Sequence, residues 1–246
     1  MSGTRPSGRG RILGNERTAW VYTPPGYDPA AGPYAFVLLF DGWAYANLIP
    51  TATILDNLIG AGRLPPTVAL LLGNPDPQAR QRELGCHEPF VAFVASELLP
   101  WVRGRYAVAA DPARSVVGGS SRGGLAAAFA GLRRPALFGR VLCQSGAFWF
   151  KPDGDPEPEW LARPVAATPL RPLRFHLDVG LLEVGVEDDD MPNMLTASRH
   201  MRDVLRAKGY AVDYSEFSGG HSYSCWEVAL PEGLLALLGL DTVQGA

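Results

Sequence analysis

The chain has 246 residues, of which 47% are hydrophobic and 19% are charged, and its formal net charge is −3. This length and apolar content predict one globular domain with a large core. Basic and acidic residues are interspersed, unlike the basic footprint of a nucleic-acid-binding protein, and no apolar run reaches the ~20 residues that span a bilayer. We therefore expect neither a nucleic acid nor a membrane as a partner.

The N-terminal segment and the cysteines indicate where the protein works. Residues 1–16 are basic and glycine-rich and lack the apolar core of a signal peptide, so we expect a flexible tail before a domain over residues 17–246. The chain has three cysteines, Cys86, Cys143 and Cys225, and such a small, odd number without a secretion signal is typical of a reducing, cytoplasmic compartment. The four histidines are scattered and no HExxH motif is present, so we expect no metal site.

Apolar runs alternate with helical patterns along the chain. Runs such as Phe36–Phe40 and Val68–Leu72 are apolar throughout, which is typical of strands buried on both faces of a parallel sheet. The first two runs are joined by a Pro/Gly-rich turn, so we expect them to form an antiparallel edge together. The expected strands cover residues 18–24, 34–42, 67–74, 115–119, 140–146, 173–180 and 212–220.

Helices are expected in the gaps, over residues 53–61, 90–106, 123–132, 191–208 and 226–238. Alternating strands and helices predict a doubly wound, mostly parallel α/β sheet flanked by helices in a single domain. The segment 151–170 is rich in proline and acidic residues, and we expect it to be a surface loop or lid.

The stretch GSSRG at residues 119–123 fits the pattern G-x-S-x-G, between an expected strand and an expected helix. In a nucleophile elbow, the sharp turn strains the backbone of the central serine and exposes its hydroxyl above the sheet. This predicts Ser121 as a nucleophile and the backbone N–H of Arg122 as an oxyanion donor. The alternative is a turn of small residues in which Ser121 only caps the helix.

A serine hydroxyl is a weak nucleophile unless a base takes its proton, and in this fold the order along the chain is Ser, acid, His. His87 precedes Ser121, His176 lies within an expected strand, and His200 lies on an amphipathic helix. His221 follows the last strand, where two glycines allow a sharp loop. We therefore predict His221 as the base.

The acid is expected after the strand over residues 173–180. Glu183 stands alone among apolar residues there, which favours an oriented carboxylate. The alternatives are Asp188, Asp189 and Asp190, which belong to an acidic run before a helix and would stabilise the N-terminus of that helix. We prefer Glu183.

A second oxyanion donor is expected in the loop after an early strand. The strand over residues 34–42 ends in the sequence Asp41-Gly42-Trp43. We predict that the backbone N–H of Gly42 or Trp43 is this donor, and the alternative is a simple turn.

Four stretches resemble the catalytic domain of the enterochelin (ferric enterobactin) esterase family, within the esterase D-like branch of α/β hydrolases. The resemblance covers nearly the whole chain from Arg17 onward. R-x-x-E-L at residues 80–84, a QSG-aromatic run and a GGH-x-x-x-C-W ending appear in order. The stretches are FVLLFDGWAYANLIPTATILDNLIGAGRLPPTVALLL, RQRELGCHEPFVAFVASELLPWV, VVGGSSRGGLAAAFAGLRRPALFGRVLCQSGAFWF and FSGGHSYSCW.

The resemblance implies an α/β-hydrolase fold with Ser121 as nucleophile and His221 as base. Glu183 matches the glutamate of the family's G-x-x-E segment, and Arg80 matches an arginine implicated in the substrate pocket. The residue after the nucleophile is commonly aromatic in the family, whereas this chain has Arg122.

The family hydrolyses the trilactone backbone of catecholate siderophores, which usually carry iron. We therefore expect a cytoplasmic serine esterase with a small-molecule ester substrate and without a metal or organic cofactor. Arg80, Trp149 and Trp226 are expected to contact this substrate, because catechol rings need aromatic walls and cations. One alternative, which Arg122 favours, is a general carboxylesterase, thioesterase or acyltransferase. The other is a non-catalytic siderophore-binding module.

Overall fold

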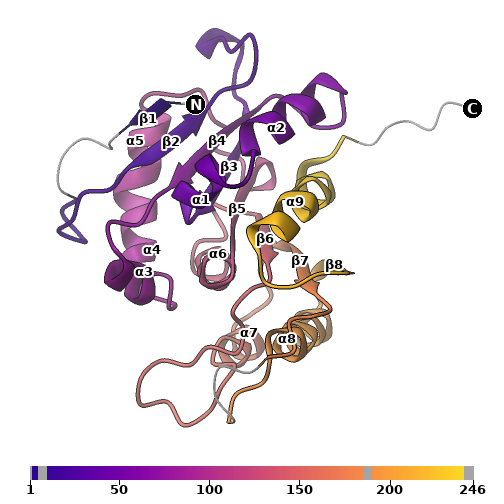
Figure 1. Cartoon of the computed structure of the whole chain (residues 1–246). Coiled ribbons are helices and arrows are strands. Elements are labelled where there is room, and N and C mark those ends of the chain that lie inside the picture. The colour runs from indigo at the N-terminus through magenta and orange to yellow at the C-terminus, as the bar shows by residue number, and fades with distance from the viewer. Residues whose placement is uncertain (1, 5–9, 186–189, 241–246) are drawn as a thin grey trace, which may run out of the picture.

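The computed structural model describes residues 2–4, 10–185 and 190–240. In this part of the chain, eight strands form one sheet in the order β1-β2-β4-β3-β5-β6-β7-β8 (Figure 1). From β3 to β8 the neighbouring strands are parallel, and β1 and β2 add an antiparallel edge. The strands are β1 (Ser2–Thr4), β2 (Ala19–Tyr22), β3 (Ala35–Phe40), β4 (Thr67–Leu72), β5 (Ser115–Ser120), β6 (Arg140–Gln144), β7 (Arg174–Gly180) and β8 (Ala211–Phe217).

Helices cover both faces of this sheet (Figure 1). Side chains of α1, α2 and α9 share one hydrophobic core with the sheet, whereas those of α4 to α8 share the other. The prediction of a doubly wound, mostly parallel sheet is therefore confirmed. The helices are α1 (Gly42–Asn47), α2 (Thr51–Gly60), α3 (Pro77–Glu83), α4 (Glu88–Phe93), α5 (Leu99–Arg103), α6 (Arg122–Arg133), α7 (Ala162–Ala167), α8 (Met194–Lys208) and α9 (Tyr223–Leu238).

The central strands are apolar throughout because both of their faces are buried. In β3, Phe36 and Leu38 pack into one core, while Val37 and Leu39 pack into the other. Successive side chains of a strand point to opposite faces, so a strand between two helical layers needs apolar residues at every position. This packing holds the carboxyl ends of β3, β5 and β7 at one edge of the sheet, where the expected functional loops begin.

The pairing of β2 differs from the prediction. β2 pairs antiparallel with β4, with Trp20 opposite Leu71, and β4 lies between β2 and β3. A tight hairpin has a connection of 2–5 residues. The segment 23–34 is longer and contains a 3₁₀ turn at Pro29–Ala31, so it does not force β2 and β3 to be neighbours.

The helix expected over residues 90–106 is divided into three parts. α4 is followed by a π-helical stretch, Val94–Leu98, and then by α5. Pro100 lies in the first turn of α5. Proline has no N–H to donate to a preceding carbonyl, so the regular hydrogen-bond pattern changes at this point.

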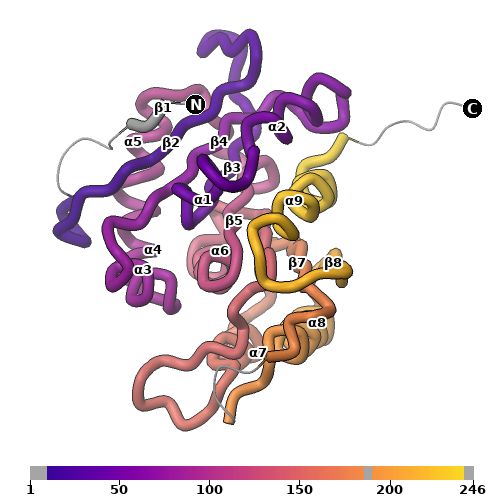
Figure 2. The backbone as a smooth tube through the Cα atoms, viewed as in Figure 1, coloured from indigo at the N-terminus to yellow at the C-terminus, as the bar shows by residue number. Residues whose placement is uncertain are grey.

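The segment 151–170 is a long excursion that contains one short helix, α7. Figures 1 and 2 show α7 beside α8 at the lower end of the molecule, and the two helices are in contact. The loop is therefore anchored at its far end, against the helix that precedes β8.

The flexibility of residues 1–16 stays a prediction, but part of this segment is bonded to the domain. The backbone N–H groups of Arg11 and Ile12 donate to the carboxylate of Glu97 at 3.1 and 3.0 Å. The side chain of Asn15 donates to Glu83 at 2.9 Å.

No helix in the described part of the chain combines the length and the apolar character needed to cross a bilayer.

Candidate active site

Ser121 occupies a strained turn between β5 and α6. Its backbone has φ 54° and ψ −121°, a conformation that costs a non-glycine residue about 1–3 kcal/mol. Three backbone hydrogen bonds hold it there: the N–H of Ser121 donates to the carbonyl of Gln144 at 2.8 Å, and its carbonyl accepts from Ala147 at 3.0 Å and from Leu125 at 3.1 Å. These are the geometry and the context of a nucleophile elbow.

The glycines around Ser121 allow the turn to be this tight. A Cβ atom on Gly119 would lie 2.7 Å from the carbonyl carbon of Gly123, closer than real Cβ contacts. A Cβ atom on Gly123 would lie 3.4 Å from a carboxylate oxygen of Asp41, so the start of α6 packs against the end of β3. The first glycine of the GSSRG pattern thus reflects a close approach of backbone, and the last one allows α6 to pack against the end of β3.

His221 and Glu183 form a hydrogen bond across two loops. Nδ1 of His221 lies 2.6 Å from Oε2 of Glu183, whose side chain is 1% exposed, whereas that of His221 is 40% exposed. The loops after β7 and β8 meet here, because a Cβ atom on Gly180 would lie 2.4 Å from the carbonyl oxygen of Gly219. Gly180, the last residue of β7, is therefore required for this close approach.

The second oxygen of Glu183 accepts two further hydrogen bonds. The N–H of Gly180 donates to Oε1 at 2.8 Å, and the hydroxyl of Ser145 donates to it at 2.6 Å. Burial opposes ionisation of Glu183, but the hydrogen bonds from His221, Ser145 and Gly180 outweigh burial and lower the pKa of this carboxyl. Glu183 is thus an ionised carboxylate at neutral pH.

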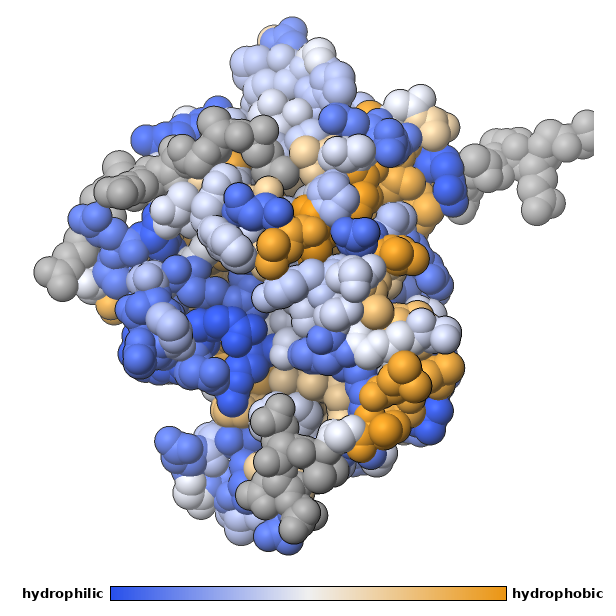
Figure 3. All heavy atoms as spheres, in the orientation of Figure 1, coloured by the Kyte–Doolittle hydropathy of each residue, from blue (hydrophilic) through white to orange (hydrophobic). Residues whose placement is uncertain are grey.

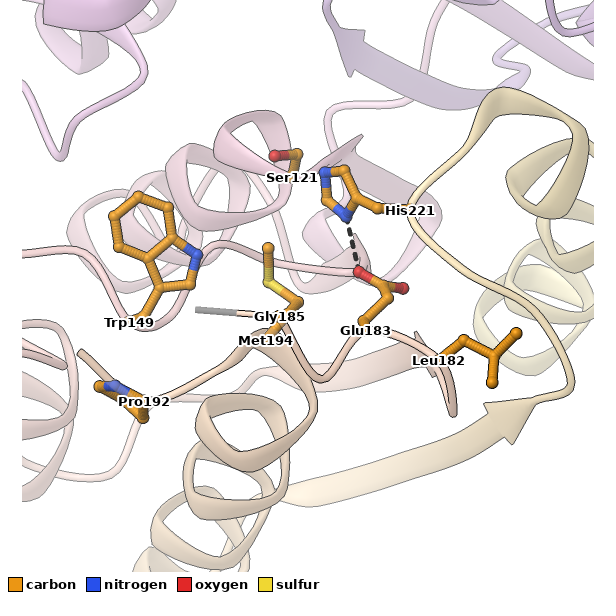
Figure 4. A pocket seen from close by; sticks show the side chains of 8 residues that line it. All are labelled: Ser121, Trp149, Leu182, Glu183, Gly185, Pro192, Met194 and His221. Carbon is orange, nitrogen blue, oxygen red and sulfur yellow. Dashed lines mark hydrogen bonds and ion pairs between the residues drawn. The ribbon is translucent and has the colours of Figure 1, made fainter. Parts of the chain in front are cut away.

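Ser121, His221 and Glu183 line one cavity of about 350 Å³. Figure 4 shows the imidazole of His221 between the side chains of Ser121 and Glu183, with Trp149 and Met194 on the other side of the space. The structure therefore brings together the three residues that the sequence predicts as a triad.

Arg80 and Trp226 line a second cavity, of about 540 Å³, that also contains Ser121 and His221. Nε and Nη2 of Arg80 each lie 2.7 Å from an oxygen of Asp41, and this hydrogen-bonded pair raises the pKa of Arg80. A bidentate pair fixes the orientation of the guanidinium. Arg80 thus reaches the site while it is bonded to the loop after β3.

That loop carries the predicted oxyanion donors. Asp41 has φ 57°, and α1 begins at the next residue, so the N–H groups of Gly42 and Trp43 belong to the first turn of a helix and have no partner within it. A Cβ atom on Gly42 would lie 2.2 Å from the carbonyl carbon of Leu71, so only glycine fits at this position.

The predicted aromatic residues differ in exposure. Trp149 is half-buried and borders the cavity of the three triad residues. Trp226 is 4% exposed, its ring packs edge-on against His221 at 4.8 Å between centroids, and its indole N–H donates to Ser145 at 2.9 Å. Trp43 is 56% exposed. Trp226 therefore packs against the imidazole of His221 and also borders the second cavity.

The alternative bases and acids are placed elsewhere or are not described. His176 is buried within β7, and His200 is half-exposed on α8. Asp188 and Asp189 lie outside the described residues, and Asp190 is exposed.

Sequence reasoning missed Ser145 and the partner of Arg80. Ser145 is fully buried with φ 44°, and it connects Trp226 to Glu183. Its only signal is a polar residue directly after a buried strand, in the QSG run. Asp41 carries the same signal, but nothing in the sequence pairs it with Arg80. Glu83, the glutamate of the same R-x-x-E-L motif, is bonded to Arg17 at 2.9 Å.

No cluster of three or more metal-ligating groups is found among residues 2–4, 10–185 and 190–240.

Comparison with known proteins identifies relatives of the whole chain. The family model described as "Putative esterase" matches residues 10–237. The iron(III) enterobactin esterase of Dickeya dadantii is 36% identical over 95% of this chain and 54% of its own length. That of Escherichia coli K12 is 31% identical over 92% of this chain and 54% of its own length. The chain thus spans about half the length of the curated relatives it matches.

Solved structures agree with these relatives. The crystal structure of the enterobactin esterase from Shigella flexneri in the presence of enterobactin matches with a TM-score of 0.84 at 29% identity, over 96% of this chain and 58% of that one. The ferric enterobactin esterase from Salmonella typhimurium matches with a TM-score of 0.82 at 32% identity, over the same shares of the two chains. These neighbours have the expected α/β-hydrolase fold, and the chain belongs to the putative esterase family.

Proposed function

We propose that the protein is a serine esterase that hydrolyses the trilactone ester bonds of a catecholate siderophore through an acyl-enzyme. The observation that carries the proposal is the 2.6 Å hydrogen bond between His221 and the buried Glu183, in the same cavity as the strained Ser121. A nucleophile next to a base that a third group orients is the general arrangement of nucleophilic catalysis.

In this mechanism, Oγ of Ser121 attacks the ester carbonyl carbon while Nε2 of His221 takes the hydroxyl proton. Glu183 accepts a hydrogen bond from Nδ1–H, which leaves Nε2 unprotonated before attack and stabilises the imidazolium formed during it. The tetrahedral intermediate then collapses, and His221 returns the proton to the leaving alkoxide. Water attacks the acyl-enzyme with His221 as base, and the acid product and free Ser121 are released.

The negative charge that develops on the carbonyl oxygen needs preorganised donors. We assign this role to the backbone N–H of Arg122 and to the N–H of Gly42 or Trp43. The close packing of Gly123 against the end of β3 supports this assignment, because it holds the first turn of α6 next to the loop that contains Gly42.

The substrate class rests on the relatives. Two curated relatives are named iron(III) enterobactin esterases, and the Shigella flexneri structure was determined in the presence of enterobactin. Arg80, Trp149 and Trp226 border the two cavities at Ser121, where they would meet the charged and aromatic parts of such a substrate. Iron enters this reaction only as cargo of the substrate, and its release follows from cleavage of the trilactone.

We also propose that the enzyme works in the cytoplasm. The three cysteines, all in the described part of the chain, are free thiols, and two of them are buried. This usage is typical of a reducing compartment. The small-molecule ester is the partner proposed for the site, and no cofactor takes part in the mechanism.

The test is a substrate panel resolved by mass spectrometry: ferric and iron-free trilactones beside short-chain 4-nitrophenyl esters and acyl thioesters. The proposal expects linear trimer, dimer and monomer products from the trilactones, and none from the Ser121→Ala variant. Turnover of the simple esters or thioesters alone would support the broader acyl hydrolase that Arg122 favours. Binding of trilactones without turnover would identify a siderophore-binding module.

A further inference from the structure

Three segments of the chain have to meet with the correct spacing at the catalytic serine. They are the turn between β5 and α6, the first turn of α1 with the proposed oxyanion donors, and the loop that leads from β8 into α9 with His221. Figure 1 shows α1 and α9 in a helical layer off the sheet. The hydrogen bonds of the sheet therefore do not fix the distance of these two helices from Ser121. A shift of about 1 Å in such a group can cost about 10²-fold in rate.

Gln144, the last residue of β6, is bonded to all three segments. Its backbone carbonyl accepts from the N–H of Ser121 at 2.8 Å. Its Oε1 atom accepts from the hydroxyl of Tyr45, on α1, at 2.9 Å. Its Nε2 atom donates to the carbonyl of Trp226, on α9, also at 2.9 Å. We call these two side-chain hydrogen bonds the Gln144 bridge, because they join the two helices across the end of β6.

Each end of the Gln144 bridge lies near a group of the proposed mechanism. Tyr45 belongs to the same short helix as Gly42, which begins that helix. Trp226 lies in the first turn of α9, and its ring packs edge-on against the imidazole of His221, at 4.8 Å between centroids. The bridge thus connects the helix of the proposed oxyanion donors to the residue that packs against the base.

The Gln144 bridge depends on a neutral amide. A backbone carbonyl can only accept, so the nitrogen of Gln144 faces Trp226 and its oxygen faces the hydroxyl of Tyr45. Gln144 and Tyr45 are both fully buried, where a polar group is costly unless it is hydrogen-bonded. Figure 3 shows side chains of mixed hydropathy over α1 and α9, and the bridge lies beneath this surface. An apolar side chain at residue 144 would therefore fill the space but leave α1 and α9 unlinked.

We propose that Gln144 is a positioning residue that holds the oxyanion donors on α1 and the base His221 at their working distances from Ser121. The inference rests on the proposed esterase function. Gln144 is buried and lines neither of the two cavities at Ser121, so it acts through other groups and not on the substrate. Groups aligned for the transition state raise kcat and leave ground-state binding nearly unchanged. Loss of the bridge should therefore lower kcat far more than it changes KM.

Steady-state kinetics with 4-nitrophenyl butyrate test this role in two variants. Gln144→Met removes both hydrogen bonds of the bridge, and Tyr45→Phe removes a single hydroxyl. Loss of a whole oxyanion donor costs about 10²–10³-fold in kcat, so displaced donors should cost less, about 30-fold in Gln144→Met and about tenfold in Tyr45→Phe. KM should stay within about threefold of the wild type. A merely structural role would lower the melting temperature and leave kcat of the folded enzyme unchanged, which would contradict the proposal.

A thionoester isolates the effect on the oxyanion donors. Sulfur accepts hydrogen bonds more weakly than oxygen, so O-4-nitrophenyl thionobenzoate gains less from these donors than 4-nitrophenyl benzoate. The ratio of kcat/KM for the oxygen ester to that for the thionoester should fall about three- to tenfold in Tyr45→Phe. Tyr34→Phe is the matched control and should keep the wild-type ratio. Tyr34 is also buried, but its hydroxyl bonds to the backbone of Asp28 at 3.0 Å, at the amino end of β3.

The double variant Gln144→Met/Tyr45→Phe tests whether the two residues act as one bridge. Once the amide is removed, the hydroxyl of Tyr45 has no bridge to complete. The double variant should therefore lose no more kcat than Gln144→Met alone. Losses that multiply as if the two residues were independent would contradict the bridge.

Hydrogen exchange gives a readout that does not need turnover. In Gln144→Met, the amides of α1 and of residues 218–226 should exchange faster than in the wild type, while those of α8 should not change. Unchanged exchange in both segments would overturn the proposal even in an active enzyme. A wild type that hydrolyses neither simple esters nor trilactones would instead refute the proposed esterase function. Faster exchange confined to the two segments would still support Gln144 as the residue that positions them.

Discussion

Two buried carboxylates near the end of β7 have opposite tendencies to ionise. Glu183, in the loop after the strand, accepts hydrogen bonds from His221, Ser145 and the N–H of Gly180, and its pKa is lowered. Asp178, within the strand, is fully buried, and neither of its oxygens has a hydrogen-bond partner among the described residues. Burial therefore raises the pKa of Asp178.

The difference shows that hydrogen-bond donors, and not burial, make a carboxylate suited to support a charged imidazole. Asp178 also has a histidine near it, but Nε2 of His176 lies 3.7 Å from Oδ2, beyond hydrogen-bond distance. Position in the fold explains the contrast. Glu183 follows the strand, where the N–H of Gly180, the last residue of β7, and the hydroxyl of Ser145 both donate to it. The carboxylate of Asp178, within β7, has no donor at hydrogen-bond distance among the described residues.

The largest expected effect comes from Glu183→Gln. The amide keeps the shape of the side chain but removes the charge that stabilises the imidazolium, so kcat should fall by a factor on the order of 10³–10⁴. Steady-state kinetics with a 4-nitrophenyl ester measure this loss, and Asp190→Asn, an exposed acid, is the control. Most of the activity remaining in Glu183→Gln would mean that the acid is misassigned.

A smaller loss is expected for Ser145→Ala. The change removes one hydrogen bond to an ionised carboxylate, so kcat should fall about tenfold while KM changes little. Loss of a donor also raises the pKa of Glu183, so the acid limb of the kcat–pH profile should move to higher pH.

The control for Ser145→Ala is Ser198→Ala, because Ser198 is a buried serine on α8 whose hydroxyl has no partner among the described residues. A structural role alone would lower the melting temperature of Ser145→Ala and leave its kcat–pH profile in place. That pattern would contradict the positioning role.

The smallest catalytic effect is expected for Asp178→Asn, with kcat within about threefold of the wild type. The pH dependence of the free energy of unfolding tests the role of Asp178 more directly than kcat does. A carboxyl whose folded pKa is raised binds more protons in the native state, so the wild-type free energy of unfolding falls as pH rises from about 4 towards that raised pKa. Urea unfolding between pH 4 and 8 should show this slope, at most about 1.4 kcal/mol per pH unit, and Asp178→Asn should remove it. A slope that persists in the variant would disprove the contrast between the two acids.

Much of the fold could be predicted because its signals are local. The apolar runs of β3 and β4 and the alternation of strands and helices indicate a doubly wound sheet without reference to distant residues. The partner of β2 could not be predicted, because hydrophobic pattern does not determine which strand lies beside it. The π-helical stretch before Pro100 could not be predicted either, because the apolar pattern of residues 90–106 is that of one continuous helix.

In the candidate site, too, the features encoded locally could be predicted and the long-range contacts could not. The turn at Ser121 is encoded in five consecutive residues, and Gly180 and Gly219 mark the loops that bring Glu183 to His221. The pair formed by Asp41 and Arg80 joins segments far apart in sequence, so only the folded chain reveals it. The catalytic roles of these residues stay predictions until they are tested.

The most direct test of the central claim is labelling with a fluorophosphonate, followed by peptide mapping. Such reagents react readily only with a serine whose hydroxyl proton is taken by a base. We predict one label, on Ser121, which is lost in Ser121→Ala and strongly slowed in Glu183→Gln. A label on Ser120, or no label on the folded protein, would contradict the account.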